Sequence, residues 1–551
     1  MRQYTSYSDC FTQPRKRAIM LPRANKRPVV SDNSGGKLTS SRQPKLIQTP
    51  VTAQQLGAII KSARDIMRKD KGLSGELDRL PMLTWVLFLK FLDDTERVRE
   101  DETLLSGTRY RPVIEAPYRW RDWASDETGM TGDELISFVN NEEAVRPDGE
   151  RGPGLFAYLR SLRGETEDGD RRDVIATVFR GVMNRMINGY LLRDVINKVN
   201  SIDFASTDEI HTLGHLYESM LKEMRDAAGD SGEFYTPRPV VRFMVEVVDP
   251  RLGETVLDPA CGTGGFLVEA YSHLERQCET VEDREVLQVE SILGGEAKPL
   301  PYLMAQMNLL LHGLESPKID PGNSLRHPLR EIGDKDRLDV VLTNPPFGGE
   351  EERGIQNNFP IDKQTSETAL LFLQLIMRKL RRHPNPGRAG VVVPNGTLFA
   401  GGVAARIKEE LLKEFDLHTV VRLPNGVFAP YTSIPTNLLF FDRNGPTEEV
   451  WYYEQPLPEG RKNYTKTKPM RYEELADCLA WWKSRKENER AWNVRAEDIL
   501  ANGCNLDVKN PHSKEDLEHL PPEELVDNIL AKEMRIAEIM AEIKSSLGAE
   551  R

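Results

Sequence analysis

The chain has 551 residues, of which 39% are hydrophobic and 29% charged, and its formal net charge is −12. At about 150 residues per domain, such a length predicts two to four domains and excludes a small scaffold held together by disulfides. The five cysteines form no CxxC pair and have no zinc-like spacing with histidine, so we expect reduced thiols in a cytoplasmic protein and no metal site. The most apolar run, residues 83–92, is far shorter than the roughly 20 residues of a membrane helix and contains Lys90. We therefore expect no membrane association.

Residues 1–50 differ from the rest of the chain in charge. They hold 10 Lys and Arg and 2 Asp and Glu, whereas residues 51–551 hold 64 and 84. Many Pro, Ser and Gly residues and few large apolar ones predict a disordered basic arm. The arm could anchor the protein on DNA, but a solvated tail is the commoner role of such charge runs and we favour it. The acidic remainder predicts that a duplex-binding protein of this kind concentrates its basic groups in one cleft or relies on a partner.

Residues 51–200 have helical periodicity. Apolar residues between 56 and 67 recur at spacings of three and four, and a second apolar helix is expected around 83–92. Loops that contain Gly, Pro and Asp separate the segments, so we expect a helical N-terminal domain. A further amphipathic helix over about 207–228 leads into the next region.

Residues 201–445 change to short β-branched runs that alternate with helices. The runs stand at 254–258, 291–296, 338–344, 389–395, 419–423 and 437–442. Apolar strands between helices predict an α/β fold with a mostly parallel, doubly wound, Rossmann-like sheet covered on both faces. Ligands of such sheets bind at the carboxyl ends of the strands, so the motifs that follow these runs are the candidate site.

Residues 446–551 are polar and mixed up to a final amphipathic helix. From 523 to 547 apolar residues recur every three or four positions, interrupted only by Glu533. Such a seam needs a partner helix, and packing on the chain's own body explains it as well as an intermolecular coiled coil does. We therefore predict a C-terminal extension that ends in a helical tail able to bind a partner.

The first chemical motif is VLDPACGTGGFLVEA at 256–270, which places Asp258 and a Gly-containing turn between a strand and a helix. Glycines let the backbone approach a ligand closely, and a helix N-terminus presents free amides. A dinucleotide-binding fingerprint would need a third glycine where Phe266 and Leu267 stand, and a P-loop would need Gly-Lys-Ser/Thr. The turn therefore indicates a different cofactor.

The second motif is LTNPPFG at 342–348. Two prolines after Asn344 remove backbone donors and fix the chain, which leaves the Asn344 side-chain oxygen and the Pro345 carbonyl as acceptors for one exocyclic amino group. Phe347 offers a face on which an extruded base can stack. Taken alone the tetrapeptide could be a simple turn, but its order and spacing after the first motif make that the weaker explanation.

Together, DPACGTGG and NPPF resemble the S-adenosylmethionine loop and the amino-group site of DNA amino-methyltransferases, in which NPPF is the form usual for adenine. GEFYTPRPVVRFMV at 232–245 resembles the segment that closes over the methionine end of the cofactor. The resemblance to modification subunits of type I restriction-modification systems spans about 52–548. It implies an adenine-N6 DNA methyltransferase with a Rossmann-like methyltransferase sheet and S-adenosyl-L-methionine as cofactor.

The resemblance also implies a catalytic set and a cofactor-binding set of residues. Glu296 is expected to accept the ribose hydroxyls, and Asn323, or alternatively Asp320, to contact the cofactor adenine. Asp258 is expected to order the cofactor loop, although a strand-end cap is an alternative role. The catalytic set is Asn344, Pro345, Pro346 and Phe347. The cofactor-binding set is Glu233, Tyr235, Thr236, Pro237, Asp258, Pro259, Gly262, Thr263, Gly264, Gly265, Phe266, Glu296 and Asn323.

The partners implied by the resemblance are double-stranded DNA, a separate specificity subunit for target recognition, and a motor-nuclease restriction subunit, with two copies of this chain per complex. A first rival is a self-contained restriction-modification enzyme, but it would need a nuclease and a target-recognition domain. Glu296-Ala297-Lys298 has the Glu-x-Lys form of a nuclease motif, yet its place after a strand fits ribose binding better. A second rival is a catalytically silent scaffold, which the intact Gly262, Gly264, Asn344 and Phe347 disfavour.

Overall fold

The computed structural model describes residues 53–106, 110–164, 171–204, 213–214, 217–221, 236–429, 432, 434–465, 467–512, 530 and 532–540. These residues belong to one compact unit. The predicted arm at 1–50, much of the helix expected over 207–228, and the site residues Glu233 and Tyr235 lie outside the described residues. Within the described ranges, no helix is long and apolar enough to cross a membrane.

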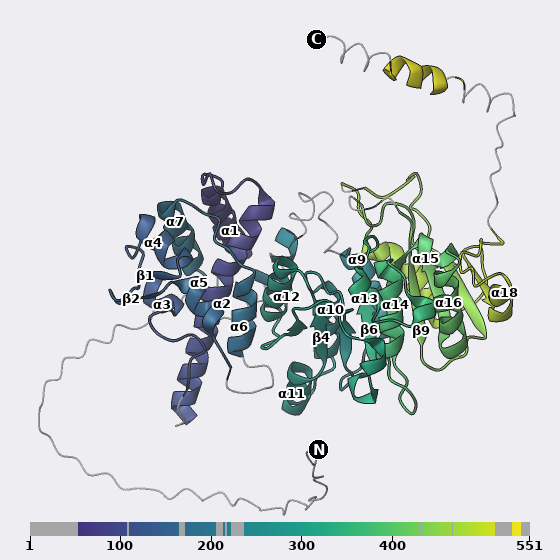
Figure 1. Ribbon diagram of the computed structural model, residues 1–551, viewed down its shortest axis with the longest axis horizontal. Helices are drawn as coiled ribbons and strands as arrows, with labels where there is room; N and C mark the ends of the chain where they lie inside the picture. The colour runs from purple at the N-terminus through teal and green to yellow at the C-terminus, as the bar shows by residue number, and fades with distance from the viewer. Residues whose placement is uncertain are drawn as a thin grey trace, which may run out of the picture. The chain divides into compact units, whose positions relative to one another are not determined.

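The first part of the chain is helical, as its periodicity predicts (Figure 1). Both predicted helices are present, and most of their apolar residues are buried. A short antiparallel pair, β1 and β2, was not expected. The elements are α1 (Ala53–Met67), α2 (Glu76–Ser106), α3 (Trp120–Trp123), α4 (Gly132–Asn140), β1 (Glu143–Val145), β2 (Arg151–Pro153), α5 (Leu155–Ser161), α6 (Arg171–Arg180) and α7 (Gly189–Asn200).

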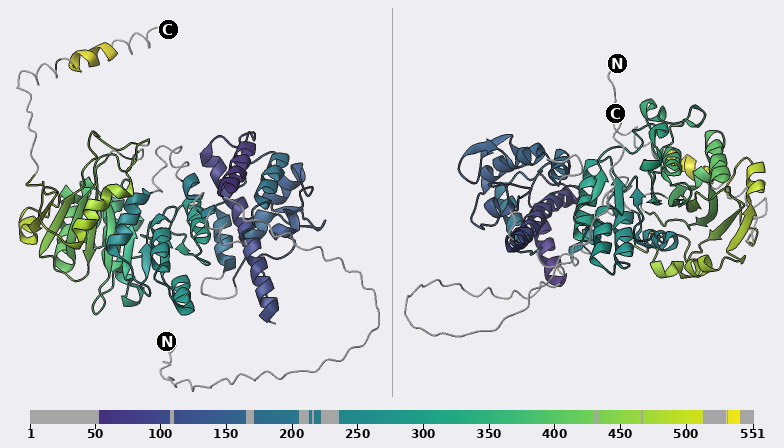
Figure 2. Two further views of the ribbon diagram at one scale, coloured as in Figure 1. Left: turned by 180° about the vertical axis from the view of Figure 1, so that it is seen from behind. Right: turned by 90° about the horizontal axis from the view of Figure 1, so that it is seen from below.

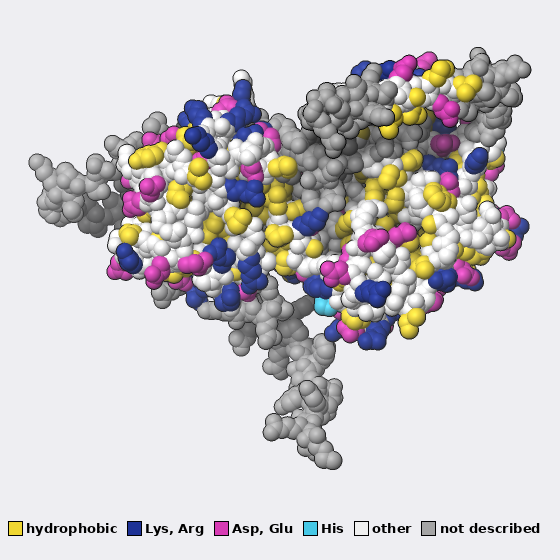
Figure 3. Space-filling view, turned by 45° about the horizontal axis from the view of Figure 1, so that its top comes forward, with side chains coloured by type: hydrophobic (Ala, Val, Ile, Leu, Met, Phe, Trp, Pro, Cys, Tyr) yellow, Lys and Arg dark blue, Asp and Glu magenta, His cyan; other side chains and the backbone are white. Residues whose placement is uncertain are grey.

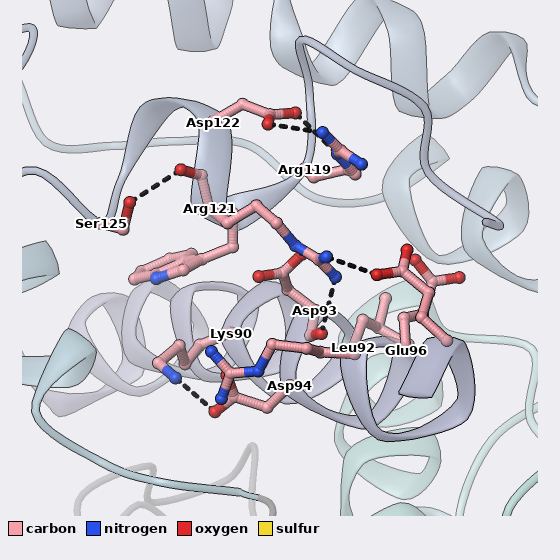
Figure 4. Close-up of polar contacts among 12 residues, drawn as sticks. Lys90, Leu92, Asp93, Asp94, Glu96, Arg119, Arg121, Asp122 and Ser125 are labelled. Carbon is pink, nitrogen blue, oxygen red and sulfur yellow. Dashed lines mark hydrogen bonds and ion pairs between the residues drawn. The ribbon is translucent and has the colours of Figure 1, made fainter. Parts of the chain in front are cut away.

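An ionic network joins α2 to the segment around α3 (Figure 4). Arg121 extends from α3 to α2, where its Nε donates to Asp93 Oδ1 at 2.8 Å and its Nη1 to Glu100 Oε2 at 2.6 Å. One turn away, Lys90 forms an ion pair with the buried Asp94. Burial raises the pKa of Asp93 although the Arg121 contact lowers it. Arg121 thus supplies the counter-charge that a carboxylate inside this domain requires.

Nine strands of the described chain form one sheet in the order β11-β10-β8-β9-β7-β6-β3-β4-β5. All six predicted strands are present, and three more join them. The strands are β3 (Val256–Asp258), β4 (Ile292–Gly295), β5 (Lys318–Asp320), β6 (Val340–Thr343), β7 (Arg388–Pro394), β8 (Asp416–Arg422), β9 (Thr436–Asp442), β10 (Glu449–Glu454) and β11 (Ala491–Arg495). Because β10 pairs with β8 and β11 pairs with β10, the sheet continues beyond residue 445.

The strand directions follow the predicted mostly parallel pattern with two exceptions. Strand β9 lies antiparallel between β7 and β8, and β11 is antiparallel to β10. Strands β7, β6, β3, β4 and β5 are all parallel. The doubly wound α/β fold is therefore confirmed.

Helices cover both faces of this sheet, as Figure 2 shows. Alternate strand residues belong to different cores: Val340 and Leu342 lie in the cluster that includes side chains of α9, α10, α12 and α17, and Val341 lies in the one that includes side chains of α14, α16 and α18. This alternation is what a sheet buried on both sides requires. The helices are α9 (Arg238–Val248), α10 (Gly265–Glu275), α11 (Val281–Val289), α12 (Pro299–Leu311), α13 (Arg353–Gln356), α14 (Thr368–Lys379), α15 (Asn395–Phe399), α16 (Val403–Glu414), α17 (Ala476–Lys483) and α18 (Ala496–Ala501).

Arg121→Ala is expected to lower the stability of the protein by about 2 kcal/mol, because it leaves Asp93 buried without its charged donor. Arg111→Ala is the matched control, since the Arg111 side chain is exposed and pairs with Glu115 at 4.0 Å, and exposed pairs contribute little. Thermal unfolding of the two variants measures the difference. Equal midpoints for both variants would contradict the role given to Arg121.

Candidate functional site

Four neighbouring parallel strands, in the order β6-β3-β4-β5, end at the same edge of the sheet. The segments that follow them carry Asn344, the glycine turn, Glu296 and Asn323 respectively. Since the carboxyl ends of such strands form the usual ligand crevice of a doubly wound sheet, the fold brings the two sequence motifs together although about 80 residues separate them.

The glycine turn after β3 depends on backbone conformations that glycine adopts easily. Gly262 has φ of 54° and Gly264 has φ of 79°, both in the left-handed region. A Cβ atom on Gly264 would lie 3.4 Å from the Cα of Ala305 in α12. The Gly262 amide donates to Glu296 Oε2 at 3.0 Å. The turn is therefore held against α12 and against the residue that follows β4.

Asp258 connects the two motifs directly. Its Oδ1 accepts a hydrogen bond from Thr343 Oγ1 at 2.6 Å, at the end of β6, and another from the Ala260 amide at 3.1 Å. Burial raises the pKa of Asp258 to about 7, and the nearby Glu296 carboxylate raises it further while both hydrogen bonds oppose the shift. Asp258 thus caps its own turn and also fixes that turn relative to the start of the NPPF segment.

Asn344 is held by one end of its amide and leaves the other end available. Its Nδ2 donates to Thr236 Oγ1 at 3.1 Å. Its Oδ1 is shielded from solvent, and among the described residues no donor reaches it. A buried acceptor without a partner is unfavourable unless a ligand supplies the donor. With Nδ2 bonded to Thr236, the oxygen is the end of the amide that a ligand can reach.

Phe347 lies beside this acceptor on the same short segment. Its half-buried ring meets Phe428 edge to face, with a centroid separation of 5.7 Å and an interplanar angle of 65°. Phe428 is itself buried and comes from the loop between β8 and β9. The pair gives the site a fixed aromatic wall.

Glu296 and Asn323 complete the edge. Each Glu296 oxygen accepts a hydrogen bond from a backbone amide, Oε2 from Gly262 and Oε1 from Lys298 at 2.7 Å, which fixes the carboxylate at the end of β4. Asn323 Oδ1 accepts from the Leu325 amide at 2.9 Å. Its rival Asp320 pairs with Arg326 at 2.5 Å, so its carboxylate is already partly engaged.

Three residues that the sequence motifs did not reveal hold the backbone of the glycine turn through hydrogen bonds. Arg238 Nη1 donates to the Gly265 carbonyl at 2.6 Å and its Nε to Glu218 at 2.7 Å. Asn308 Nδ2 donates to Glu218 at 2.6 Å and to the Thr263 carbonyl at 2.9 Å. Burial opposes the charge of Glu218, but Arg238 and Asn308 outweigh it and hold its pKa below the usual value. Residue spacing in the sequence does not reveal this network, because its members come from three separate helical segments.

The other predicted cofactor residues lie within or next to the turn. The Pro259 carbonyl accepts from Ser324 Oγ at 2.7 Å, and Pro237 precedes α9. The Phe266 side chain is part of the core, so only its backbone faces the turn. In the described ranges, no group of three or more His, Cys, Asp or Glu side chains could hold a metal ion.

Asp258→Asn is expected to change how stability depends on pH. A carboxyl whose folded pKa is about 7, against about 3.9 when unfolded, favours the folded state below the unfolded pKa, and this contribution is lost as pH rises to about 7. Asparagine cannot ionise and keeps its acceptor. The thermal midpoint of the variant minus that of the parent should therefore be more positive at pH 8 than at pH 6. An identical difference at both values would contradict the raised pKa.

Comparisons with known proteins agree with this geometry. The N-6 DNA Methylase family model matches residues 208–520, and the HsdM N-terminal domain model matches residues 56–199. The type I restriction enzyme EcoEI methylase subunit of Escherichia coli is 46% identical over 503 residues, which cover 90% of this chain and 98% of the relative.

Two solved structures are similar over most of their length. A modification subunit assigned to a type I restriction enzyme of Vibrio vulnificus YJ016 is 70% identical, with a TM-score of 0.77 over 86% of this chain and 100% of its own. A chain from a study of complex assembly and conformational transition in the type I R-M system is 42% identical, with a TM-score of 0.74 over 91% of this chain and 100% of its own. This chain therefore belongs to the N-6 DNA methylase family, among the methylase subunits of type I restriction enzymes.

Proposed function

We propose that this chain transfers the methyl group of S-adenosyl-L-methionine to the N6 amino group of adenine in a specific DNA sequence, as the modification subunit of a type I restriction-modification complex. The observation that carries the proposal is the buried Asn344 Oδ1, which has no partner in the described part of the chain and lies at the edge of the sheet that also holds the glycine turn. Family membership supports the same reaction.

The residues at this edge fit S-adenosyl-L-methionine. When bound, the cofactor supplies a methyl group on a positively charged sulfur. Gly262 and Gly264 allow the backbone to approach a ligand closely, and the N-terminus of α10 begins directly after them. The Glu296 carboxylate follows β4 at this edge, where it would accept from the ribose hydroxyls, and we assign the cofactor adenine to Asn323, or alternatively to Asp320 at the end of β5.

The role of the remaining predicted cofactor residues follows from their positions. Thr236 and Pro237 precede α9, and Thr236 holds the Asn344 amide. We propose that they form one wall of the cofactor site together with Glu233 and Tyr235, which lie outside the described residues. Pro259, Thr263, Gly265 and the backbone of Phe266 shape the turn.

The chemistry depends on how the amino group is held. Asn344 Oδ1 and the Pro345 carbonyl accept its two hydrogens, which draws the N6 lone pair out of conjugation with the ring and offsets the positive charge that develops during transfer. Pro346 fixes the backbone of this segment. A base within a duplex cannot reach such a site and must be extruded, so Phe347 provides the stacking face with Phe428 behind it.

We also propose that the chain acts with partner subunits, because its relatives are named as subunits of type I restriction enzymes. A specificity subunit would select the DNA sequence, a motor-nuclease subunit would cut, and two copies of this chain would serve each complex. The apolar side chains of the helix at 532–540 are exposed, which supports an intermolecular contact over packing on the chain's own body. They are Met534, Ile536, Ile539 and Met540.

The division of the chain into domains at residues 50, 200 and 445 stays a prediction. Its last boundary lies within a continuous sheet.

The direct test is transfer of labelled methyl from S-adenosyl-L-methionine to DNA by this chain alone and by this chain with its candidate specificity subunit. We expect label in N6-methyladenine only when both subunits are present. Transfer by the chain alone would favour a self-contained enzyme. Absence of transfer in both mixtures, with cofactor binding retained, would favour a scaffold.

Asn344→Ala is expected to reduce methyl transfer by about 100- to 1,000-fold, which is the usual effect of losing one stabilising group in a transition state. Cofactor affinity should stay the same, because the lost acceptor faces the base. Asn502→Ala is the control, because this exposed residue follows α18 beside β11, at the opposite edge of the sheet. Transfer at the parental rate in the Asn344 variant would remove the basis of the proposed mechanism.

Arg238→Lys is expected to weaken cofactor binding by about tenfold. Lysine keeps the charge but lacks the planar guanidinium group that donates to Glu218 and to the Gly265 carbonyl at the same time. Arg251→Lys, at an exposed position in the loop after α9, is the matched control. Calorimetric titration with S-adenosyl-L-methionine measures the effect, and thermal unfolding checks the fold. Unchanged affinity in both variants would show that the network does not position the turn.

A further inference from the structure

A cavity of about 720 Å³ lies beside the C-terminal end of α14. Its basic residues come from segments that meet at the amino ends of β6 and β7. Arg378 precedes β7, and Arg443 follows β9, which runs antiparallel to β7. Asn344 lies at the opposite, carboxyl end of β6. The cavity is therefore separate from the methyl-transfer site.

The described lining of this cavity is rich in arginine. Lys363 already forms an ion pair with Glu410, which leaves Glu414 as the acid facing four guanidinium groups. Elsewhere, on the face shown in Figure 3, basic and acidic side chains are interspersed. The charged residues that line the cavity are Arg330, Lys363, Arg378, Arg382, Arg443, Glu410 and Glu414.

The arginines are close enough to repel one another. Burial lowers the pKa of Arg443 to about 10, and the charges of Arg337, Arg382 and Arg378 lower it further while Glu414 opposes them. The pKa of Arg337 is also lowered, by burial and then by Arg382 and Arg378. Like charges in a partly buried cluster are unfavourable, and a bound anion would relieve that repulsion.

Capping of α14 explains only part of the cluster. Arg337 Nη1 donates to the carbonyls of Arg378 and Leu380 at 2.6 and 2.9 Å. Arg443 Nη1 donates to the Met377 carbonyl at 2.8 Å. Cations at a helix C-terminus are stabilising, so these two arginines have a structural role.

The other three arginines of the lining have N–H donors that find no acceptor among the described residues. Arg378 donates through Nε to the Leu329 carbonyl at 3.1 Å, and its two terminal nitrogens have no acceptor among the described residues. Arg330 and Arg382 make neither a side-chain hydrogen bond nor an ion pair within the described chain, although both line the cavity. Helix capping does not account for them.

We propose that this cavity is a second ligand site, which binds phosphate groups. Guanidinium groups match phosphate oxygens with paired hydrogen bonds and are the preferred side chains for that purpose. The phosphate could belong to the DNA backbone at a distance from the target base or to a free oligophosphate, and the shared chemistry is the same. The cavity would then contribute to DNA affinity in an otherwise acidic chain, or sense a soluble phosphate compound.

The test uses the full chain with Arg330→Ala and Arg382→Ala combined, because neither side chain has a hydrogen-bond or ion-pair partner within the described ranges whose loss would disturb folding. The control combines Arg284→Ala and Lys486→Ala, which removes two positive charges at exposed positions far from the cavity in sequence. A single charge reversal, Arg382→Glu, serves as a second variant. Calorimetric titration with tripolyphosphate forms one arm, and binding of a duplex of arbitrary sequence at several salt concentrations forms the other.

We expect tripolyphosphate affinity to fall at least about tenfold in the double variant, to fall further or vanish with Arg382→Glu, and to stay unchanged in the control. If the site holds DNA backbone, the slope of log affinity against log salt should also become shallower by about two. A response to tripolyphosphate alone would assign the site to a free phosphate compound, and a response of the duplex alone would assign it to DNA. Equal behaviour of the parent, the control and both cavity variants in both arms would overturn the proposal.

Discussion

The hydrogen bond between Asp258 and Thr343 is the contact on which the site depends. It joins the ends of β3 and β6, the two adjacent strands that carry the glycine turn and the NPPF segment. Asp258 is 1% exposed, and a buried carboxyl with few donors has a strong requirement for each of them. The Thr343 hydroxyl and the Ala260 amide meet that requirement only when both strand ends keep their relative positions, so one side chain fixes the cofactor turn relative to the acceptors for the amino group.

A second consequence is that the polar groups of the site are oriented before any ligand binds. Thr236 accepts from Asn344 Nδ2, so the opposite end of that amide presents its oxygen to the site. Arg238 and Asn308, which Glu218 joins, hold the carbonyls of Gly265 and Thr263, so the backbone of the turn is fixed in advance. Groups oriented in advance stabilise charge in a transition state without reorganising at that moment. An acceptor held ready for a ligand in this way also explains why Asn344 Oδ1 has no partner among the described residues.

Much of this arrangement could be predicted from the sequence. The β-branched runs predicted six strands because strands buried on both faces are almost continuously apolar. Strand β5 was missed because Lys318–Asp320 has one apolar residue between two charged ones, and β10 and β11 because they lack the continuous aliphatic runs of the central strands. The antiparallel direction of β9 depends on chain reversal through residues 423–435, which periodicity does not encode. Motif residues such as Asn344 and Glu296 were found, whereas Phe428 and Glu218 were not, because their roles depend on contacts between distant segments.

The most direct measurement is a crystal structure of the chain with S-adenosyl-L-methionine bound. The account predicts ribose hydroxyls on Glu296, the methionine moiety over Gly262 and Gly264, and the methyl group facing Asn344 Oδ1, with the Asp258 to Thr343 hydrogen bond retained. A cofactor bound away from the carboxyl ends of β3 and β4 would contradict it. So would an Asn344 oxygen turned away from the methyl group and paired within the protein.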